Sequence, residues 1–318
     1  MNEKRKSSWK PQAIAGALIL VIIAVIIVKL IIWDKSGNVE LEEVEAGTFD
    51  YESLDIVFNV DQAILDSHPS DDVNDILILG NESVASAPGG KSMIDMISDL
   101  ENTRVTSFTY YYSQVADATN AFGNDNVSFW QCANLYDIVK ALCTKDYSLQ
   151  KTALDNGEVI DQTFYDRLVA TDLDKIDTLI ICYDSIDYRK ASVLYDPNDK
   201  YNTSTYEGAL RAAITSIQSD APHIKVIVAS PYLHGVINNE TIEPATMINY
   251  GNGNLSEYVM REYNIAMECC VSYCDNFFGL ITEDTMTKYC NDGTVYLLNA
   301  DGVKLIGNHM IEFIQRPY

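Results

Sequence analysis

Basic side chains are scarce in this sequence, and their scarcity excludes one class of partner. The 318 residues contain 22 Lys and Arg against 46 Asp and Glu, a formal net charge of −24 at pH 7. A surface of that sign repels polyanions, so we expect no nucleic-acid partner. Basic proteins, neutral glycans and divalent cations remain compatible with it, as does an acidic surface that serves solubility alone.

Zinc-ribbon cysteine spacing, internal repeats and low-complexity tracts are also absent. We therefore predict no metal site, no cofactor and no repeat architecture. Cys182 ends an apolar run and is expected to be a small core residue. Disulfides between Cys274 and Cys290, or between Cys132 and Cys143, are conceivable in an exported domain, but spacing alone does not establish them.

Residues 13–33 form a nearly unbroken apolar run with one charge, Lys29. A helix of roughly 20 apolar residues crosses a bilayer, and Trp33 would lie at its interface. Lys and Arg precede the run and Glu residues follow it, so residues 1–12 are expected in the cytoplasm and the rest outside. A cleaved signal peptide is the alternative, but residues 31–35 offer no small-residue cleavage site. We predict a single-pass anchor in the cell membrane.

The part outside the membrane is expected to be an acidic stalk with an extension, residues 34–73, followed by one α/β domain, residues 74–318. Residues 34–318 hold 17 basic and 45 acidic side chains, a net charge of −28. Short apolar runs alternate with helical patterns, which predicts a parallel sheet covered on both faces. The expected strands are residues 76–79, 105–112, 178–182, 224–230 and 277–281; the expected helices are residues 92–100, 129–142 and 256–274, with another after a capping box at Ser204.

Three segments resemble, in order, the active-site blocks of the GDSL/SGNH hydrolases. Residues 76–82 (ILILGNE) stand where the family has a strand followed by Gly-Asp-Ser. Residues 179–188 (LIICYDSIDY) are similar to its strand followed by Gly-x-Asn-Asp, and residues 301–307 (DGVKLIG) to its Asp-x-x-His block. The resemblance covers residues 75–314 and implies a three-layer α/β/α sandwich with a flavodoxin-like parallel sheet.

The residues that carry the family's chemistry are missing from these blocks. The resemblance implies a Ser nucleophile, a His base held by Asp, and an Asn that donates to the oxyanion. The Ser position is Glu82, the Asn position is Ile186 and the His position is Lys304. Asp184 replaces a Gly, and only Asp301 is retained. We therefore expect no intact catalytic set.

Two hypotheses concern what replaces that chemistry. Glu82 and Lys304 have opposite charges at positions that touch in the family, so an ion pair could fill the former cleft; the alternative is that both are solvated rim residues. Ser83 and His309 could instead provide a displaced nucleophile and base. This second hypothesis is disfavoured, because a one-residue slip at a tight turn redirects the side chain.

The leading functional prediction is a non-catalytic domain at the cell envelope that binds a glycan or a partner protein. Tyr111 and Tyr112, at the end of an expected strand, could stack against a sugar, although edge packing would equally explain them. Because relatives of the fold serve acyl transfer on surface polysaccharides, a membrane acyltransferase is a conceivable partner. Two alternatives stay open: an esterase or acyltransferase with non-standard residues, and a structural anchor that recruits a basic partner.

Overall fold

The computed structural model describes residues 53–68, 72–110, 113–116, 132–157, 160–291 and 293–316. All of them belong to one compact unit that begins at Tyr51. The predicted membrane segment, residues 13–33, and the tyrosines Tyr111 and Tyr112 lie outside these ranges. Within the ranges, no helix combines the length and the apolar character needed to cross a membrane.

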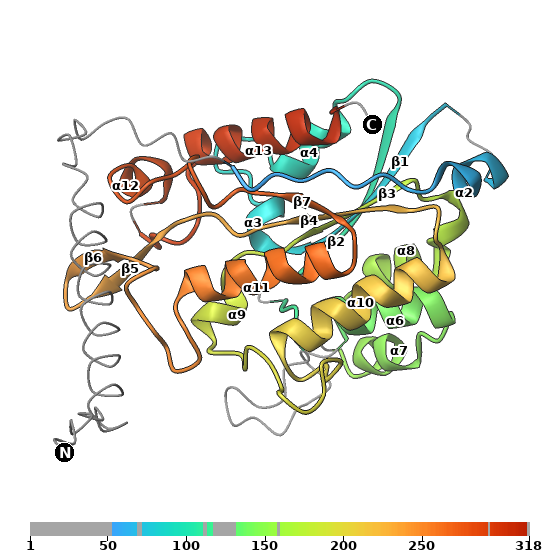
Figure 1. The fold of residues 1–318 in the computed structure, drawn as a ribbon, viewed down its shortest axis with the longest axis horizontal. Coiled ribbons are helices and arrows are strands. Elements are labelled where there is room, and N and C mark those ends of the chain that lie inside the picture. The colour runs from blue at the N-terminus through green and yellow to red at the C-terminus, as the bar shows by residue number, and fades with distance from the viewer. Residues whose placement is uncertain are drawn as a thin grey trace, which may run out of the picture. The chain divides into compact units, whose positions relative to one another are not determined.

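A parallel sheet forms the centre of the domain, as the alternating pattern predicts (Figure 1). Across the sheet its five strands are β2 (Thr103–Tyr110), β1 (Asn74–Asn81), β3 (Thr178–Cys182), β4 (Lys225–Ala229) and β7 (Ser272–Cys274). This is the order of a doubly wound fold, in which ligands bind beyond the carboxyl ends of the strands.

The central strands are apolar throughout because both faces of the sheet are covered. Residues 76–79 of β1 have no exposed surface, and every residue of β3 and β4 is buried. Cys182 ends β3 in the core, as expected. The strand expected at residues 277–281 is wrong, since β7 ends earlier. The Asp275 carboxylate accepts hydrogen bonds from the backbone N–H groups of Phe277 and Phe278, at 3.0 and 3.1 Å, and turns the chain away.

Helices cover both faces of the sheet, with α4 and α13 on one side and α6, α10 and α11 on the other (Figure 1). The three-layer sandwich is therefore confirmed for the described residues. The helices are α2 (Gln62–Ser67), α3 (Glu82–Ala85), α4 (Met93–Ser98), α6 (Leu135–Thr144), α7 (Ser148–Asp155), α8 (Gln162–Ala170), α9 (Ile186–Arg189), α10 (Tyr206–Asp220), α11 (Leu255–Glu268), α12 (Met286–Tyr289) and α13 (Ala300–Ile314), with a 3₁₀ turn at Leu173–Lys175.

Several helix boundaries differ from the sequence prediction: α6 begins at Leu135 rather than at residue 129, and α4 covers only Met93–Ser98 of the expected residues 92–100. The cap of α10 is Thr205 rather than Ser204: the Thr205 hydroxyl accepts the N–H of Gly208 at 3.1 Å. Helix α11 ends at Glu268, well before the predicted end near residue 274, because Cys270 adopts a positive φ of 53° that a helix cannot continue.

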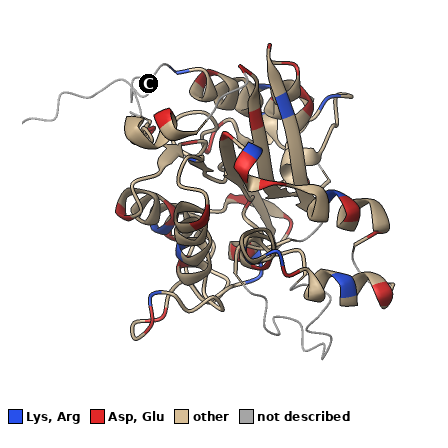
Figure 2. Cartoon of the chain, turned by 90° about the vertical axis from the view of Figure 1, so that its right-hand side faces the viewer, with Lys and Arg blue, Asp and Glu red and all other residues tan. Residues whose placement is uncertain are grey.

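Two further features bear on the sites below. Residues 53–58 run beside the edge strand β7, where Ile56 forms an antiparallel bridge with Tyr273. A hairpin of β5 (Gly235–Asn238) and β6 (Thr241–Pro244) follows β4 and was not anticipated. None of the seven cysteines forms a disulfide, so neither conceivable pairing is present. Asp and Glu are spread over many helices and strands rather than gathered on one element (Figure 2).

Candidate functional site

Glu82, at the nucleophile position of the resemblance, lies just beyond the carboxyl end of β1. Asn81 ends the strand and caps α3, so Glu82 is the first residue of that short helix. Its side chain is half-buried, and both carboxylate oxygens are shielded from solvent with no hydrogen-bond partner among the residues that the structure describes. A carboxylate in this position costs free energy, because it has lost water without gaining donors.

The surroundings of Glu82 change its protonation. Burial and, after it, the negative charge of Asp184 raise the pKa of Glu82 from 4.5 to about 7, although Arg189 and Lys190 act in the opposite direction. Near neutral pH the group therefore holds a proton in about half of the molecules. Such a group can exchange a proton, but it is not the weakly acidic hydroxyl that a serine esterase requires.

Asp184 is the centre of the buried polar network beside Glu82. It follows β3, the strand next to β1, and is 5% exposed. Its Oδ1 accepts hydrogen bonds from the Asn81 side-chain amide at 2.7 Å and from the Ile186 backbone N–H at 2.8 Å. Asn81 in turn accepts the N–H of Asp184 at 3.3 Å. These bonds join the carboxyl ends of β1 and β3.

Arg189, the last residue of α9, places a positive charge on this network. Its Nη2 lies 3.3 Å from Asp184 Oδ2, and its side chain is 15% exposed. The guanidinium stacks on the ring of Tyr296, with Cζ 3.8 Å from the centroid, in a cation–π contact. Arg189 is thus the closest compensation for the two acidic groups.

The proposed Glu82–Lys304 ion pair does not form. Asp301 and Lys304 are exposed positions in the first turns of α13, which begins at Ala300 with Asn299 as its cap. The Asn299 side chain accepts the N–H of Gly302 at 3.0 Å, so the helix starts early and includes the retained Asp301. Glu82 faces Asp184 and Arg189 instead, and the solvated alternative is correct for Lys304.

Ser83 and His309 are not partners either. The Ser83 hydroxyl donates to Asn81 Oδ1 at 2.9 Å. The ring nitrogens of His309 contact Asp55 and Asn276, at 3.1 and 3.0 Å. Ile186, at the oxyanion Asn position, is 2% exposed and offers no side-chain donor. The structure therefore brings Glu82, Asp184 and Ile186 to one edge of the sheet and leaves Asp301, Lys304 and His309 elsewhere in the fold.

Known structures resemble this arrangement. A protein from Lactobacillus plantarum is 14% identical, with a TM-score of 0.52 over 78% of this chain and 100% of that one. A structure assigned as a GDSL-like lipase from Bacteroides ovatus is 13% identical, over 77% and 99% of the two chains, with a TM-score of 0.41. A lipase/acylhydrolase from Enterococcus faecalis is also 13% identical, over 76% and 95%, at 0.40. No protein-family model and no curated protein sequence matches the chain.

The fold of the chain is similar to that of the Lactobacillus plantarum protein. At these identities the likeness concerns the fold alone. The strand order and the positions of the first two blocks, at the ends of β1 and β3, agree with it. What the sequence resemblance implied about the framework is confirmed, and it carries no activity over to this chain.

One Ser–His contact exists among the residues that the structure describes, and sequence reasoning missed it. The Ser185 hydroxyl lies 2.6 Å from His234 Nε2, and His234 Nδ1 lies 2.7 Å from the Gly235 carbonyl oxygen. The two residues are 3% and 0% exposed, and His234 lies in the loop between β4 and β5. Burial lowers the pKa of His234 to about 4, which keeps the ring neutral. Its position shortly after β4 was the available signal, because parallel strands end at one edge.

A cavity of about 550 Å³ lies at the opposite, amino ends of the strands. Asn74, Thr103 and Thr178, at the starts of β1, β2 and β3, line it. His68 stacks on His223 in its wall, with ring centroids 3.6 Å apart. His223 lies in the turn between α10 and β4 and is 8% exposed. This cavity is therefore separate from the site around Glu82.

Proposed function

We propose that this protein is a non-hydrolytic domain with a GDSL/SGNH-like fold that binds a glycan at the outer face of the cell membrane. The observation that carries the proposal is Glu82 at the nucleophile position, with its carboxylate enclosed and partnerless. An acidic side chain there, beside Asp184, repels the oxyanion that ester hydrolysis must stabilise. Residues 13–33 would anchor the chain, with residues 1–12 in the cytoplasm.

The first prediction is that the protein does not hydrolyse esters. The purified full-length chain, in detergent, should release no p-nitrophenol from p-nitrophenyl acetate and no acetate from acetylated glycans above the buffer rate. Replacing Ser83 with Ala should leave this result unchanged, because its hydroxyl only donates to Asn81. Turnover that Ser83→Ala abolishes would overturn the proposal.

A serine hydrolase that uses Ser185 is the second candidate, and the 2.6 Å contact with His234 favours it. The enclosure of both side chains opposes it, since a substrate carbonyl has to reach the hydroxyl. Ser185→Ala therefore belongs in the same assay. Turnover that disappears in Ser185→Ala but persists in Ser83→Ala would select this candidate.

An exposed tyrosine beside the site supports a glycan as the ligand. Tyr250 is 43% exposed, and its ring packs 5.0 Å from that of Tyr188, the residue before Arg189. A ring held by another ring offers a rigid apolar face with a polar edge, which suits the stacking of a sugar. Tyr111 and Tyr112 stay predictions for the same role.

The second prediction follows from that ring. On an array of bacterial surface glycans, Tyr250→Ala should weaken binding at least about tenfold, a loss of about 1.4 kcal/mol. Tyr201→Ala is the matched control, because Tyr201 is 45% exposed on another loop and should bind as the wild type does. Equal binding by both variants would exclude Tyr250, and Tyr111→Ala and Tyr112→Ala test the remaining rings. If the wild type bound no glycan, the remaining hypothesis would be a structural anchor that recruits a basic partner.

A further inference from the structure

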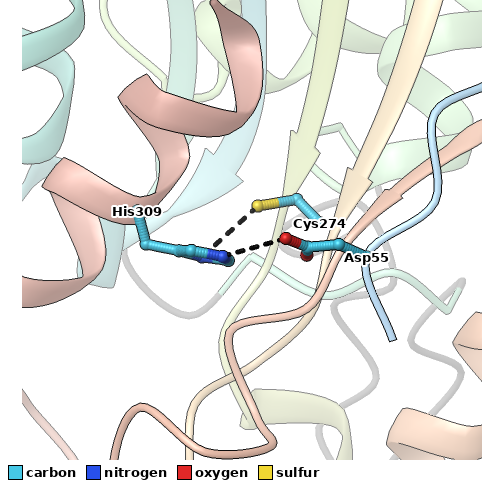
Figure 3. A group of neighbouring side chains, drawn as sticks. All are labelled: Asp55, Cys274 and His309. Carbon is cyan, nitrogen blue, oxygen red and sulfur yellow. Dashed lines mark hydrogen bonds and ion pairs between the residues drawn. The ribbon is translucent and has the colours of Figure 1, made fainter. Parts of the chain in front are cut away.

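At the edge of the sheet, strand β7 and helix α13 bring together a thiol and an imidazole beside the carboxylate of Asp55 (Figure 3). Cys274 ends β7, Asn276 follows two residues later, and His309 projects from the middle of α13. Cys274 and Asn276 are each 1% exposed. None of these residues belongs to the network around Glu82.

We propose that Cys274, Asn276 and His309 bind one divalent transition-metal cation of the Zn²⁺ type. His309 Nδ1 lies 3.7 Å from Cys274 Sγ and 3.0 Å from Asn276 Oδ1, and those two atoms are 3.9 Å apart. Zinc bonds of about 2.3 Å to sulfur and about 2.0–2.2 Å to nitrogen and oxygen place ligand atoms at such separations. A cation can therefore reach all three atoms with small side-chain shifts.

Asp55 orients the imidazole for this role. Its Oδ2 lies 3.1 Å from His309 Nε2, so that nitrogen carries a proton and donates it in a hydrogen bond. In the metal-free protein Nδ1–H donates to Asn276 Oδ1 at 3.0 Å, so a cation that binds at Nδ1 would release that proton and take its place. A carboxylate on the far nitrogen is the usual support for a metal-binding histidine, because it fixes the ring and makes the coordinating nitrogen more basic.

The local charge also favours a cation. Asp55 and Asp275 are both next to the cluster, and Arg316 balances only one of them, at 2.6 Å from Asp55. Burial raises the pKa of the Cys274 thiol, so the sulfur is protonated until a metal binds. On binding, the S–H proton leaves to solvent and the thiolate coordinates the cation. The two positive charges of the cation are then balanced by the thiolate and by the carboxylate that Arg316 does not neutralise.

Metal binding would fasten the approach to the domain. Asp55 belongs to residues 53–58, which cross β7, and Asp275 accepts the Leu54 N–H at 2.8 Å. A cation on His309 would thereby hold β7, α13 and, through Asp55, this crossing segment.

Cobalt substitution tests the site. The full-length chain should be expressed with Co²⁺ in the medium, because the ligands are buried, and purified in detergent. We expect about one equivalent of cobalt and a thiolate-to-cobalt absorption band in the near ultraviolet. Cys274→Ala and Cys274→Ser should both lose the band and that equivalent. Asp55→Asn should weaken affinity about 10–100-fold.

The control is Cys290→Ala, which removes another buried thiol and should retain both the metal and the band. The band matters because the many surface carboxylates can hold cobalt weakly without sulfur. Circular dichroism of each variant verifies its folding, and Cys274→Ser decides the question if Cys274→Ala is unfolded. A wild-type protein without the band, or a Cys274→Ser variant that keeps it, would show that the cluster is only hydrogen-bonded.

Discussion

Replacing Arg189 with Met should lower the free energy of unfolding by about 3 kcal/mol, the largest effect that we expect from a single substitution here. Methionine keeps most of the side-chain volume and its packing against Tyr296 but removes the charge. Asp184 and Glu82 would then be enclosed without their positive neighbour. This loss is at the lower end of the range for breaking a buried ion pair, because 15% of the Arg189 side chain is exposed to solvent.

A second arginine in the same chain provides the control for this experiment. Arg261 lies 3.3 Å from a carboxylate oxygen of Glu207, the same separation as in the Arg189 pair, and also stacks on a tyrosine, Tyr195. Its side chain is 40% exposed, so Arg261→Met should cost less than about 1 kcal/mol. Urea unfolding of both variants at pH 7 measures the difference. Equal losses of stability in the two variants would mean that burial adds nothing to the cost of removing the Arg189 charge.

The framework could be predicted from the sequence because local patterns determine it. The strand predicted at residues 178–182 is observed with those bounds, and the first strand of the domain surrounds the predicted apolar run. These runs are fully buried, and burial on both faces leaves a continuous apolar signature. The last strand was misplaced because a side-chain carboxylate, Asp275, sets the turn after it, and no periodicity reports such a bond.

The site could be predicted only in part, and distance along the chain explains the rest. Glu82, Asp184 and Ile186 were identified because the segments that contain them resemble two active-site blocks of the GDSL/SGNH hydrolases. The ion pair of Asp184 with Arg189 and the contact between Ser185 and His234 were missed. The cluster of Asp55, Cys274 and His309 was missed for the same reason, since Asp55 and His309 are 254 residues apart in sequence.

Glu82→Gln should stabilise the protein at pH 8 and leave its stability almost unchanged at pH 4.5. Below pH 4.5 the carboxyl is protonated in both the folded and the unfolded chain. As the pH rises towards 7, the unfolded chain releases this proton while the folded protein retains it, because the pKa of Glu82 is raised from 4.5 to about 7. The contribution of Glu82 to stability therefore falls between pH 4.5 and about 7, and the loss is complete above pH 7. The full cost is roughly 3 kcal/mol, which solvent screening of a half-buried group reduces to about 1.5 kcal/mol.

Urea titrations of the wild type and of Glu82→Gln at pH 4.5 and 8 separate this contribution from other titrating groups, which are common to both proteins. Glu312→Gln, the same change at an exposed position of α13, should give no such pH dependence. The double variant Glu82→Gln/Arg189→Met should lose about 1 kcal/mol less than Arg189→Met alone does, because one of the two stranded carboxylates is gone. A Glu82→Gln variant that is less stable than the wild type at pH 8 would mean that the carboxylate is ionised and paired with a positive group. The non-hydrolytic assignment depends on an enclosed carboxylate without a partner, so this result would contradict it.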